Sequence, residues 1–408
     1  MVLVVLIILS GRIFVHGIAD YYLQTAFDGN QSAIESVVSW QPHNAKGTYL
    51  KAKVIEDSQP RKAEQLLYRS LYQNPADVRA LAVLARIHAG RGELATADGM
   101  MSLVTGRMPA NKTLHLQLAN YWVERQQLER AVHEWSMALA ISPALGEQLF
   151  PVFTRVLKNT QLQHLLLPYA LEPSSWWEKF VVHATVNAKE LSTVSSLFTF
   201  RSQSEIPLTV TERHFFVQRY IKDKQWQQAY LIWVEGLSEL QRNRLSSVYD
   251  GSFEQADEKT SFGWRISSSL STQTRIRSTY GADGKSALML KFSNEEVRYR
   301  NLSQYILLPP GDYSFTAIKR TERLSGRGRL KWFVRCSDSE TDVLGESRAI
   351  LPSMEWEKMQ FIFNVPVTCG AQILRLETVG KHAFDHKLSG VMWIDNVQIE
   401  KVRLATSE

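Results

Sequence analysis

Hydrophobic positions follow two different periods along the chain. From about residue 44 to residue 239 they recur every three or four positions, which is typical of amphipathic helices, whereas from residue 247 onward apolar and polar residues alternate. The alternating stretches are SALMLKFS (286–293), GDYSFTAIKR (311–320), LKWFVRC (330–336), MQFIFNV (359–365), ILRLETV (373–379) and GVMWIDNVQIE (390–400). The pattern predicts a multidomain α-then-β protein whose C-terminal part is an antiparallel β-sandwich.

The helical part contains a repeat. Two sets of residues are each spaced by 34 positions: Pro75, Pro109 and Pro143, and Ala63, Ala97 and Ala131. A fixed period of this length predicts a solenoid of helical hairpins, in which each Pro ends a helix and each Ala lets a neighbouring helix approach closely. These columns, with the turn GRGE (90–93), resemble three tetratricopeptide repeats over residues 44–143. The register fails after Pro143, so residues 144–246 are expected to hold degenerate helical repeats, ending with DKQWQQAYLIWVEGL (223–237).

The N-terminal segment is strongly apolar. Nine apolar residues precede Ser10, and Arg12 and His16 interrupt the apolar pattern that continues to Ala19. Because a spanning helix needs about 20 apolar residues, we expect residues 1–19 to be a signal anchor or transmembrane segment whose Arg12 reaches the interface. A cleaved signal peptide and an N-terminal core helix of a cytosolic protein are the alternatives. The anchor predicts a bacterial inner-membrane protein whose main part is periplasmic.

These patterns divide the chain into six segments: 1–19, the anchor; 20–43, a linker or first helix; 44–143, three tetratricopeptide-like repeats; 144–246, degenerate helical repeats; 247–402, a β-sandwich jelly roll; and 403–408, a tail.

Two cysteines occur, and both lie in the predicted sandwich. Cys336 and Cys369 each end a predicted strand. In an exported chain two such cysteines indicate a disulfide, with Cα atoms within about 7 Å, whereas in a cytosolic chain they would be two buried thiols.

Positive charge is concentrated in the sandwich. The formal charge is +6, but residues 263–335 hold 14 Lys/Arg and five Asp/Glu, which is +9 and leaves −3 for the rest. This favours a basic surface for the carboxylates or phosphates of an acidic polysaccharide or anionic membrane, and the alternative is a solvated face paired with nearby glutamates. The main candidates are Arg298, Arg300, Arg327 and Arg329, accompanied by Arg275, Arg277, Lys319, Arg320 and Arg323. No nucleic-acid partner is expected.

Three short motifs in this part carry a second resemblance. YDGSFEQ (249–255), GADGKSALMLKF (281–292) and MWIDNVQIE (392–400) resemble the opening, an early strand and the closing strand of carbohydrate-binding modules with a galactose-binding-like jelly roll. The resemblance implies that Glu254 and Asp395 lie near a structural calcium, although turn-capping carboxylates are an equal alternative. It also implies stacking of sugars on exposed aromatics, for which the candidates are Tyr305, Trp332 and Trp356, and further Tyr299 and Trp393.

Catalytic motifs are lacking. The sequence has no Gly-x-Ser-x-Gly, no His-Glu-x-x-His and no phosphate-binding loop, and we read KHAFDH (381–386) and SDSETD (337–342) as loops. We therefore predict no catalytic residue, and no cofactor apart from the possible calcium. The layout resembles accessory proteins of bacterial exopolysaccharide or envelope machinery, so we expect a scaffold whose repeats bind proteins and whose jelly roll contacts polysaccharide. A glycan-modifying enzyme and a pure protein-assembly factor remain the alternatives.

Overall fold

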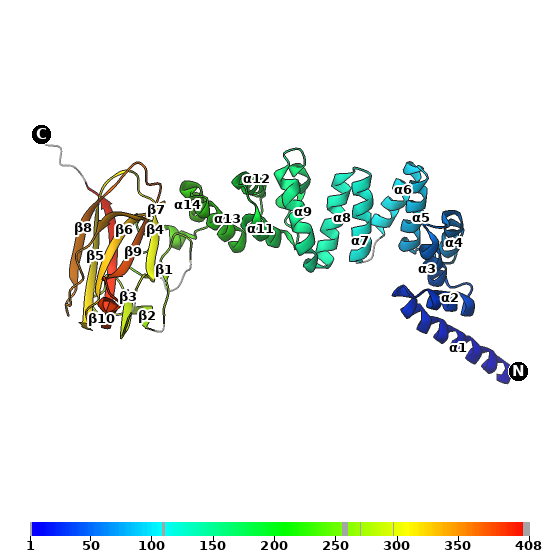
Figure 1. Cartoon of the computed structure of the whole chain (residues 1–408), viewed down its shortest axis with the longest axis horizontal. Coiled ribbons are helices and arrows are strands. Elements are labelled where there is room, and N and C mark those ends of the chain that lie inside the picture. Colours follow the sequence, from blue (N-terminus) through cyan, green and yellow to red (C-terminus); the bar gives the residue numbers. More distant parts are fainter. Residues whose placement is uncertain (1, 108–110, 255–259, 270, 297, 403–408) are drawn as a thin grey trace. The chain divides into compact units, whose positions relative to one another are not determined.

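A computed structural model describes residues 2–107, 111–254, 260–269, 271–296 and 298–402, without the side chains of residues 2–9, 11, 340, 383 and 384. Helices make up the N-terminal part and two antiparallel sheets the C-terminal part, as predicted (Figure 1). The chain divides into two compact units. The first comprises Met1–Tyr169 and Pro173–Trp176, and the second comprises Ala170–Glu172 and Trp177–Glu408.

The first unit is a series of helices joined by short turns. Its elements are α1 Val2–Phe27, α2 Gln31–Trp40, α3 Ala45–Ile55, α4 Pro60–Gln73, α5 Val78–Gly90, α6 Leu94–Gly106, α7 Lys112–Glu124, α8 Leu128–Ile141, η1 Pro143–Leu145, α9 Gly146–Lys158 and η2 Gln163–Leu166. The pairs α3–α4, α5–α6 and α7–α8 are the three expected hairpins.

The repeat register is confirmed by burial. Ala63, Ala97 and Ala131 are fully buried on the second helices of the three hairpins, where a larger side chain would separate the packed helices. The GRGE turn joins α5 to α6, and its Gly92 adopts a φ of 83°, a left-handed conformation that glycine reaches without a steric cost. Pro109 lies outside the described residues.

A buried polar contact between a histidine and a glutamate replaces one apolar contact of the third repeat. His115 stands where the repeat pattern has a large apolar residue, and its Nδ1 lies 2.7 Å from Glu134 Oε2 on the next helix. The Thr105 hydroxyl donates to the other Glu134 oxygen at 2.6 Å. His115 and Glu134 are both buried, so the departure from the pattern on one helix is matched by an acid on its neighbour.

Most of the segment predicted to be a membrane anchor, residues 1–19, has side chains that the structure does not describe. α1 begins at Val2, but the side chains of residues 2–9 and 11, which form most of the predicted anchor 1–19, are not among those described. In the rest of the chain, where side chains are placed, no helix is long and apolar enough to cross a membrane.

The second unit begins with helices. After α10 Leu167–Leu171 these are α11 Trp177–Asn187, α12 Leu191–Ser202, α13 Val210–Lys222, α14 Trp226–Glu235 and α15 Glu239–Arg242. Ala229 and Trp233 on α14, within the degenerate repeat 223–237, are both buried.

A buried ion pair connects α12 to α13. The Arg201 Nε donates to Glu212 Oε1 at 2.9 Å, and both residues are 1% exposed. Arg201 also donates to the carbonyls of Ile206 and Pro207, while Glu212 accepts from the Trp177 indole and the Thr209 backbone. These hydrogen bonds are charge-assisted, and together they offset the cost of removing both ions from water.

In the described part of the chain, ten strands form two five-stranded sheets. The orders are β1-β4-β9-β6-β7 and β2-β3-β10-β5-β8. The bounds are β1 Arg265–Ile266, β2 Thr272–Ser278, β3 Ser286–Glu296, β4 Leu302–Ile306, β5 Gly311–Ser325, β6 Arg329–Cys336, β7 Ser339–Glu346, β8 Glu357–Val365, β9 Gln372–Val379 and β10 Lys387–Lys401. One apolar core lies between the sheets, as in a β-sandwich, and includes Leu290 and Phe315 of the second sheet and Leu374 of the first.

The loops are placed less well by the sequence than the strands. The prediction of a loop for SDSETD (337–342) is wrong in part, because β7 begins inside it at Ser339. β7 is an edge strand of the first sheet, and its polar sequence shows no apolar alternation that would have indicated a strand. KHAFDH contains the short helix η3 Ala383–His386. LSGRGRL (324–330) connects β5 of the second sheet to β6 of the first, and Gly326 within it has a φ of 116°.

The last helices pack on the sandwich within the second unit. The Trp226 ring of α14 lies 5.2 Å from the Tyr305 ring of β4, and the Trp226 Nε1 donates to Asp338 at 3.4 Å. Trp233 lies 5.2 Å from Tyr249. These contacts place α14 beside the outer side of β4, and residues of α13 and β4 line one pocket.

Candidate functional site

Trp332 is part of the core. It is fully buried, with its ring 5.4 Å from that of Phe315 and 6.1 Å from that of Trp264. Of the neighbours Trp332 and Phe333 on β6, Trp332 is the one that faces the opposite sheet. Its prediction as a sugar-stacking platform is therefore wrong, and the same burial rules out Tyr299.

Tyr305 is covered as well. One guanidinium, that of Arg265, lies 4.1 Å from its ring centre, and Trp226 packs against it at 5.2 Å. The ring is half-buried and serves as the support on which Arg265 rests. The structure thus gives Tyr305 the role of fixing an arginine, and leaves its ring little room to stack on a sugar.

A tryptophan–arginine patch lies on the outer face of the second sheet and comprises Tyr280, Arg320, Glu322, Trp356 and Trp393. Arg320 and Trp393 are direct partners across β5 and β10, and the guanidinium carbon lies 5.6 Å from the ring centres of both Trp356 and Trp393. Arg320 and the Trp393 indole both donate to Glu322 Oε1, at 2.8 and 2.9 Å. The Trp356 indole donates to the Tyr280 carbonyl at 3.0 Å.

The patch offers flat rings beside charged groups. Tyr280 is 91% exposed and Trp356 is half-buried, whereas only 8% of Trp393 is exposed. The accessible rings are therefore Tyr280 and Trp356, with Arg320 and Glu322 next to them. A ring presented in this way, with polar groups at its border, suits the apolar face and hydroxyl groups of a sugar.

Four exposed arginines lie at one end of the first sheet. Tyr299 exchanges hydrogen bonds with Thr378 near the end of β9, and Leu330 of β6 pairs with the same Thr378 from the other side. The residues flanking Tyr299 and Leu330 are therefore brought to the same end of the sandwich. This arginine cluster consists of Arg298, Arg300, Arg327 and Arg329, all exposed.

Not every predicted cation belongs to an open basic surface. Lys319 is buried, and its ammonium donates to Glu357 and to the Leu351 carbonyl, both at 2.7 Å. Its inclusion among surface charges was wrong, because it points to the side of β5 covered by residues 351–357. Arg329 donates to the Gly326 and Gly328 carbonyls of the connection between β5 and β6.

The two predicted calcium ligands both bind the loop before β3. Glu254 Oε1 accepts from the backbone N–H groups of Lys285 and Ser286, at 2.8 and 2.9 Å. Asp395 accepts from the backbone of Asp283 and Asn396. Among the described residues no group of three or more His, Cys, Asp or Glu could hold a metal ion. Side chains alone thus do not fit a calcium site, the contacts match turn capping, and the calcium role of Glu254 and Asp395 stays a prediction.

Asp395 is electrostatically unusual. Its carboxyl is fully buried, and burial raises its pKa to about 7, an effect to which the nearby charges of Asp283 and Glu254 add. The two backbone hydrogen bonds act in the opposite direction but do not offset burial.

The two cysteines form a disulfide. Cys336 at the end of β6 and Cys369 before β9 are bonded with a Cα–Cα distance of 5.7 Å, inside the expected limit. The bond joins residues 33 positions apart. A bridge of this span stabilises a fold mainly by restricting the unfolded chain, by about 3 kcal/mol.

Replacing both cysteines by alanine should therefore lower the free energy of unfolding of the sandwich by about 3 kcal/mol. Urea unfolding with and without reductant measures this, and reductant should leave the double variant unchanged. Free Cys336 and Cys369 thiols in a non-reducing digest of exported protein would contradict the prediction.

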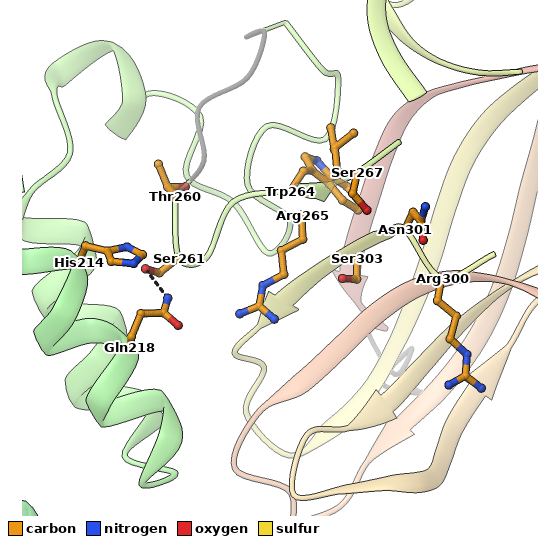
Figure 2. A pocket seen from close by; sticks show the side chains of 11 residues that line it. His214, Gln218, Thr260, Ser261, Trp264, Arg265, Ser267, Arg300, Asn301 and Ser303 are labelled. Atoms are coloured by element: carbon orange, nitrogen blue, oxygen red, sulfur yellow. Dashed lines mark hydrogen bonds between the residues drawn. The ribbon is translucent and has the colours of Figure 1, made fainter. Parts of the chain in front are cut away.

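A polar pocket lies between α13 and the first sheet, as Figure 2 shows. Its volume is about 520 Å³. Its lining comes from α13, from the segment before β1, and from β1 and β4 with the residues beside them: His214, Gln218, Thr260, Ser261, Trp264, Arg265, Ile266, Ser267, Arg300, Asn301 and Ser303. Arg300 is thus the one predicted site residue in this pocket.

No protein-family model matches the sequence, and no curated protein is significantly similar to it. Similar solved structures include the CBM22-1 xylan-binding domain of Paenibacillus barcinonensis Xyn10C, with 18% identity, 38% of this chain and 94% of that one covered, and a TM-score of 0.28. A putative sugar-binding protein of Bacteroides thetaiotaomicron has 11% identity over 39% of this chain and 100% of that one, with a TM-score of 0.30. Pseudomonas aeruginosa pilF has 11% identity over 54% of this chain and 91% of that one, with a TM-score of 0.28. At these values the similarity carries no functional conclusion.

Sequence reasoning missed Tyr280 and the role of Arg320 in the patch. Arg320 was noted only as one of several cations, because its pairing with Trp393 depends on the register of β5 against β10. The dipeptide Tyr280–Gly281 gives a weak signal. Gly281 has a φ of 75°, and a Cβ there would come within 2.9 Å of the Trp356 ring, so a glycine is needed for Tyr280 to lie beside that ring.

Proposed function

We propose that this protein is a non-enzymatic scaffold of the bacterial envelope, in which the sandwich binds an acidic polysaccharide and the helical repeats bind partner proteins, in exopolysaccharide assembly or export. The observation that carries the polysaccharide part is the tryptophan–arginine patch, which combines accessible rings with a guanidinium on an outer sheet face. The arginine cluster adds positive charge at the end of the other sheet.

Two features support the remaining parts of the proposal. A disulfide is typical of proteins outside the cytoplasm, which suits a periplasmic location. In the first unit a pocket of about 340 Å³ is lined by Trp122, Arg130 and His133, with the Arg130 guanidinium 4.5 Å from the Trp122 ring. A charged and aromatic depression on a helical solenoid suits a segment of another protein.

We expect the full-length protein to bind an acidic polysaccharide such as alginate and not neutral dextran. Affinity should fall at least about tenfold between about 0.1 and 1 M salt, because the Debye length shrinks from roughly 10 to 3 Å. The affinity for alginate should also fall about tenfold in the triple variant in which Arg298, Arg327 and Arg329 are changed to Ser. Affinity electrophoresis at several salt concentrations measures this, and the control variant removes three exposed charges of the helical part, K53S/R61S/K62S.

The alternatives predict different outcomes. Binding that ignores salt and is lost in Trp356→Ala would assign recognition to the aromatic rings alone. A protein that binds no glycan but captures envelope proteins would be a pure assembly factor. Shortening of the polysaccharide during incubation would identify a glycan-modifying enzyme.

A further inference from the structure

Among the residues that the structure describes, the pocket between α13 and the first sheet has a cationic lining without acidic side chains. Arg265 and Arg300 both line it, and no described Asp or Glu does. Among the described residues no carboxylate pairs with Arg265. Arg300 lies 3.8 Å from Glu377, which is a long contact for a side chain that is 62% exposed. The lining therefore retains about one uncompensated positive charge.

Arg265 is held in place without being neutralised. Its guanidinium lies 4.1 Å from the Tyr305 ring centre, and Tyr305 is in turn packed against Trp226. Figure 2 shows Arg265 between the α13 side chains His214 and Gln218 and the strand side chain Ser303. A fixed guanidinium loses little conformational entropy when it binds an anion, which increases the affinity of such a site.

The remaining lining is rich in neutral hydrogen-bonding groups. It includes the amides of Gln218 and Asn301 and the hydroxyls of Ser267 and Ser303. The Thr260 hydroxyl is buried and has no hydrogen-bond partner among the described residues, which is costly unless a ligand or water supplies one. The Trp264 side chain contributes an apolar wall.

We propose that this pocket is a ligand site for a sugar that carries one carboxylate, such as a hexuronate. The carboxylate pairs with Arg265, with Arg300 beside it, and the sugar hydroxyls bind the amide and hydroxyl groups of the lining. A single carboxylate matches the net lining charge better than a doubly charged phosphate does. The volume lies within the roughly 300–1,000 Å³ that is usual for small-molecule sites. The site shares neither the tryptophan–arginine patch nor the three arginines tested above, so it does not rest on polysaccharide binding there.

Calorimetric titration of the full-length protein with glucuronate, glucose and inorganic phosphate tests the proposal. We expect glucuronate to bind and the two others to bind at least about tenfold more weakly, since each lacks either the charge or the hydroxyl pattern. Equal affinity for phosphate, or no binding of glucuronate, would overturn it. Titration with a short oligoglucuronide distinguishes two sources of the ligand. If the oligomer binds more tightly than glucuronate, the ligand is the end of a polysaccharide chain. If both bind equally, the ligand is a free sugar.

Two variants locate the binding. Arg265→Gln keeps a hydrogen-bonding group but removes the charge, and should weaken glucuronate binding about tenfold or more. The matched control Arg348→Gln removes an exposed charge from the segment between β7 and β8 and should leave glucuronate binding unchanged. Asn301→Ala provides a second test, because its backbone carbonyl can still accept from Ser267 and hold the strand. Unchanged glucuronate affinity in both pocket variants would overturn the assignment.

Discussion

Replacing Arg201 by methionine should lower the free energy of unfolding by about 3–5 kcal/mol, because it leaves the Glu212 carboxylate buried without its counter-charge. Glu212 is 1% exposed and takes two of its hydrogen bonds from Arg201. The side chain of Arg201 also binds the carbonyls of Ile206 and Pro207, so the segment that leads into α13 loses two donors at once. Urea unfolding followed by the helical circular-dichroism signal measures the loss.

A second substitution separates charge from packing. Glu212→Gln in the Arg201→Met background keeps an acceptor for the Trp177 indole and for the Thr209 backbone but removes the charge, so it should recover part of the loss. The more accessible pair Arg86–Glu56, whose side chains are 35% and 18% exposed, is the control, and Arg86→Met should cost clearly less, about 1 kcal/mol. A double variant less stable than Arg201→Met would show that the uncompensated charge is not the cause.

The helical repeats could be predicted because their signal is local. Ala97 and Ala131 are buried where the spacing placed them, since a helix presents positions four apart on the same face and the hairpins repeat regularly. The network of Arg201 and Glu212 could not be predicted in the same way. It joins residues 11 positions apart across a turn, and the hydrophobic periodicity of the sequence does not determine the geometry of that turn.

In the sandwich, alternation predicted the strands but not which side of each strand faces the core. On β6 both Trp332 and Phe333 are buried, because Arg335 covers Phe333 at 4.6 Å on the outer side, so alternation could not decide which ring is exposed. The tryptophan–arginine patch and the pocket depend on strand register and on the packing of α13. Both are long-range features that a single sequence does not encode in its periodicity.

The stability of the sandwich should fall as the pH rises from about 4 to above 7, because of Asp395. Its pKa is raised to about 7 by burial, whereas an exposed aspartate titrates near 4. The folded state therefore holds the proton more tightly than the unfolded state. The stabilisation is complete below about pH 4 and is lost as the pH passes through about 7. Since each tenfold change in proton affinity equals about 1.4 kcal/mol, the full loss is about 4 kcal/mol.

Asp395→Asn should remove this dependence, because the amide stays neutral while its carbonyl oxygen can still accept one of the two backbone N–H groups. The measurement is the difference in free energy of unfolding between parent and variant at several pH values, with a chelator present so that no divalent cation contributes. The free energy of unfolding of the parent should rise relative to that of the variant as the pH is lowered through about 7. Asp342→Asn changes an exposed aspartate of β7, and its free energy of unfolding should depend on pH in the same way as that of the parent. Parallel curves for Asp395→Asn too would mean that the buried carboxyl stays ionised across this range, held by the N–H groups of Asp283 and Asn396.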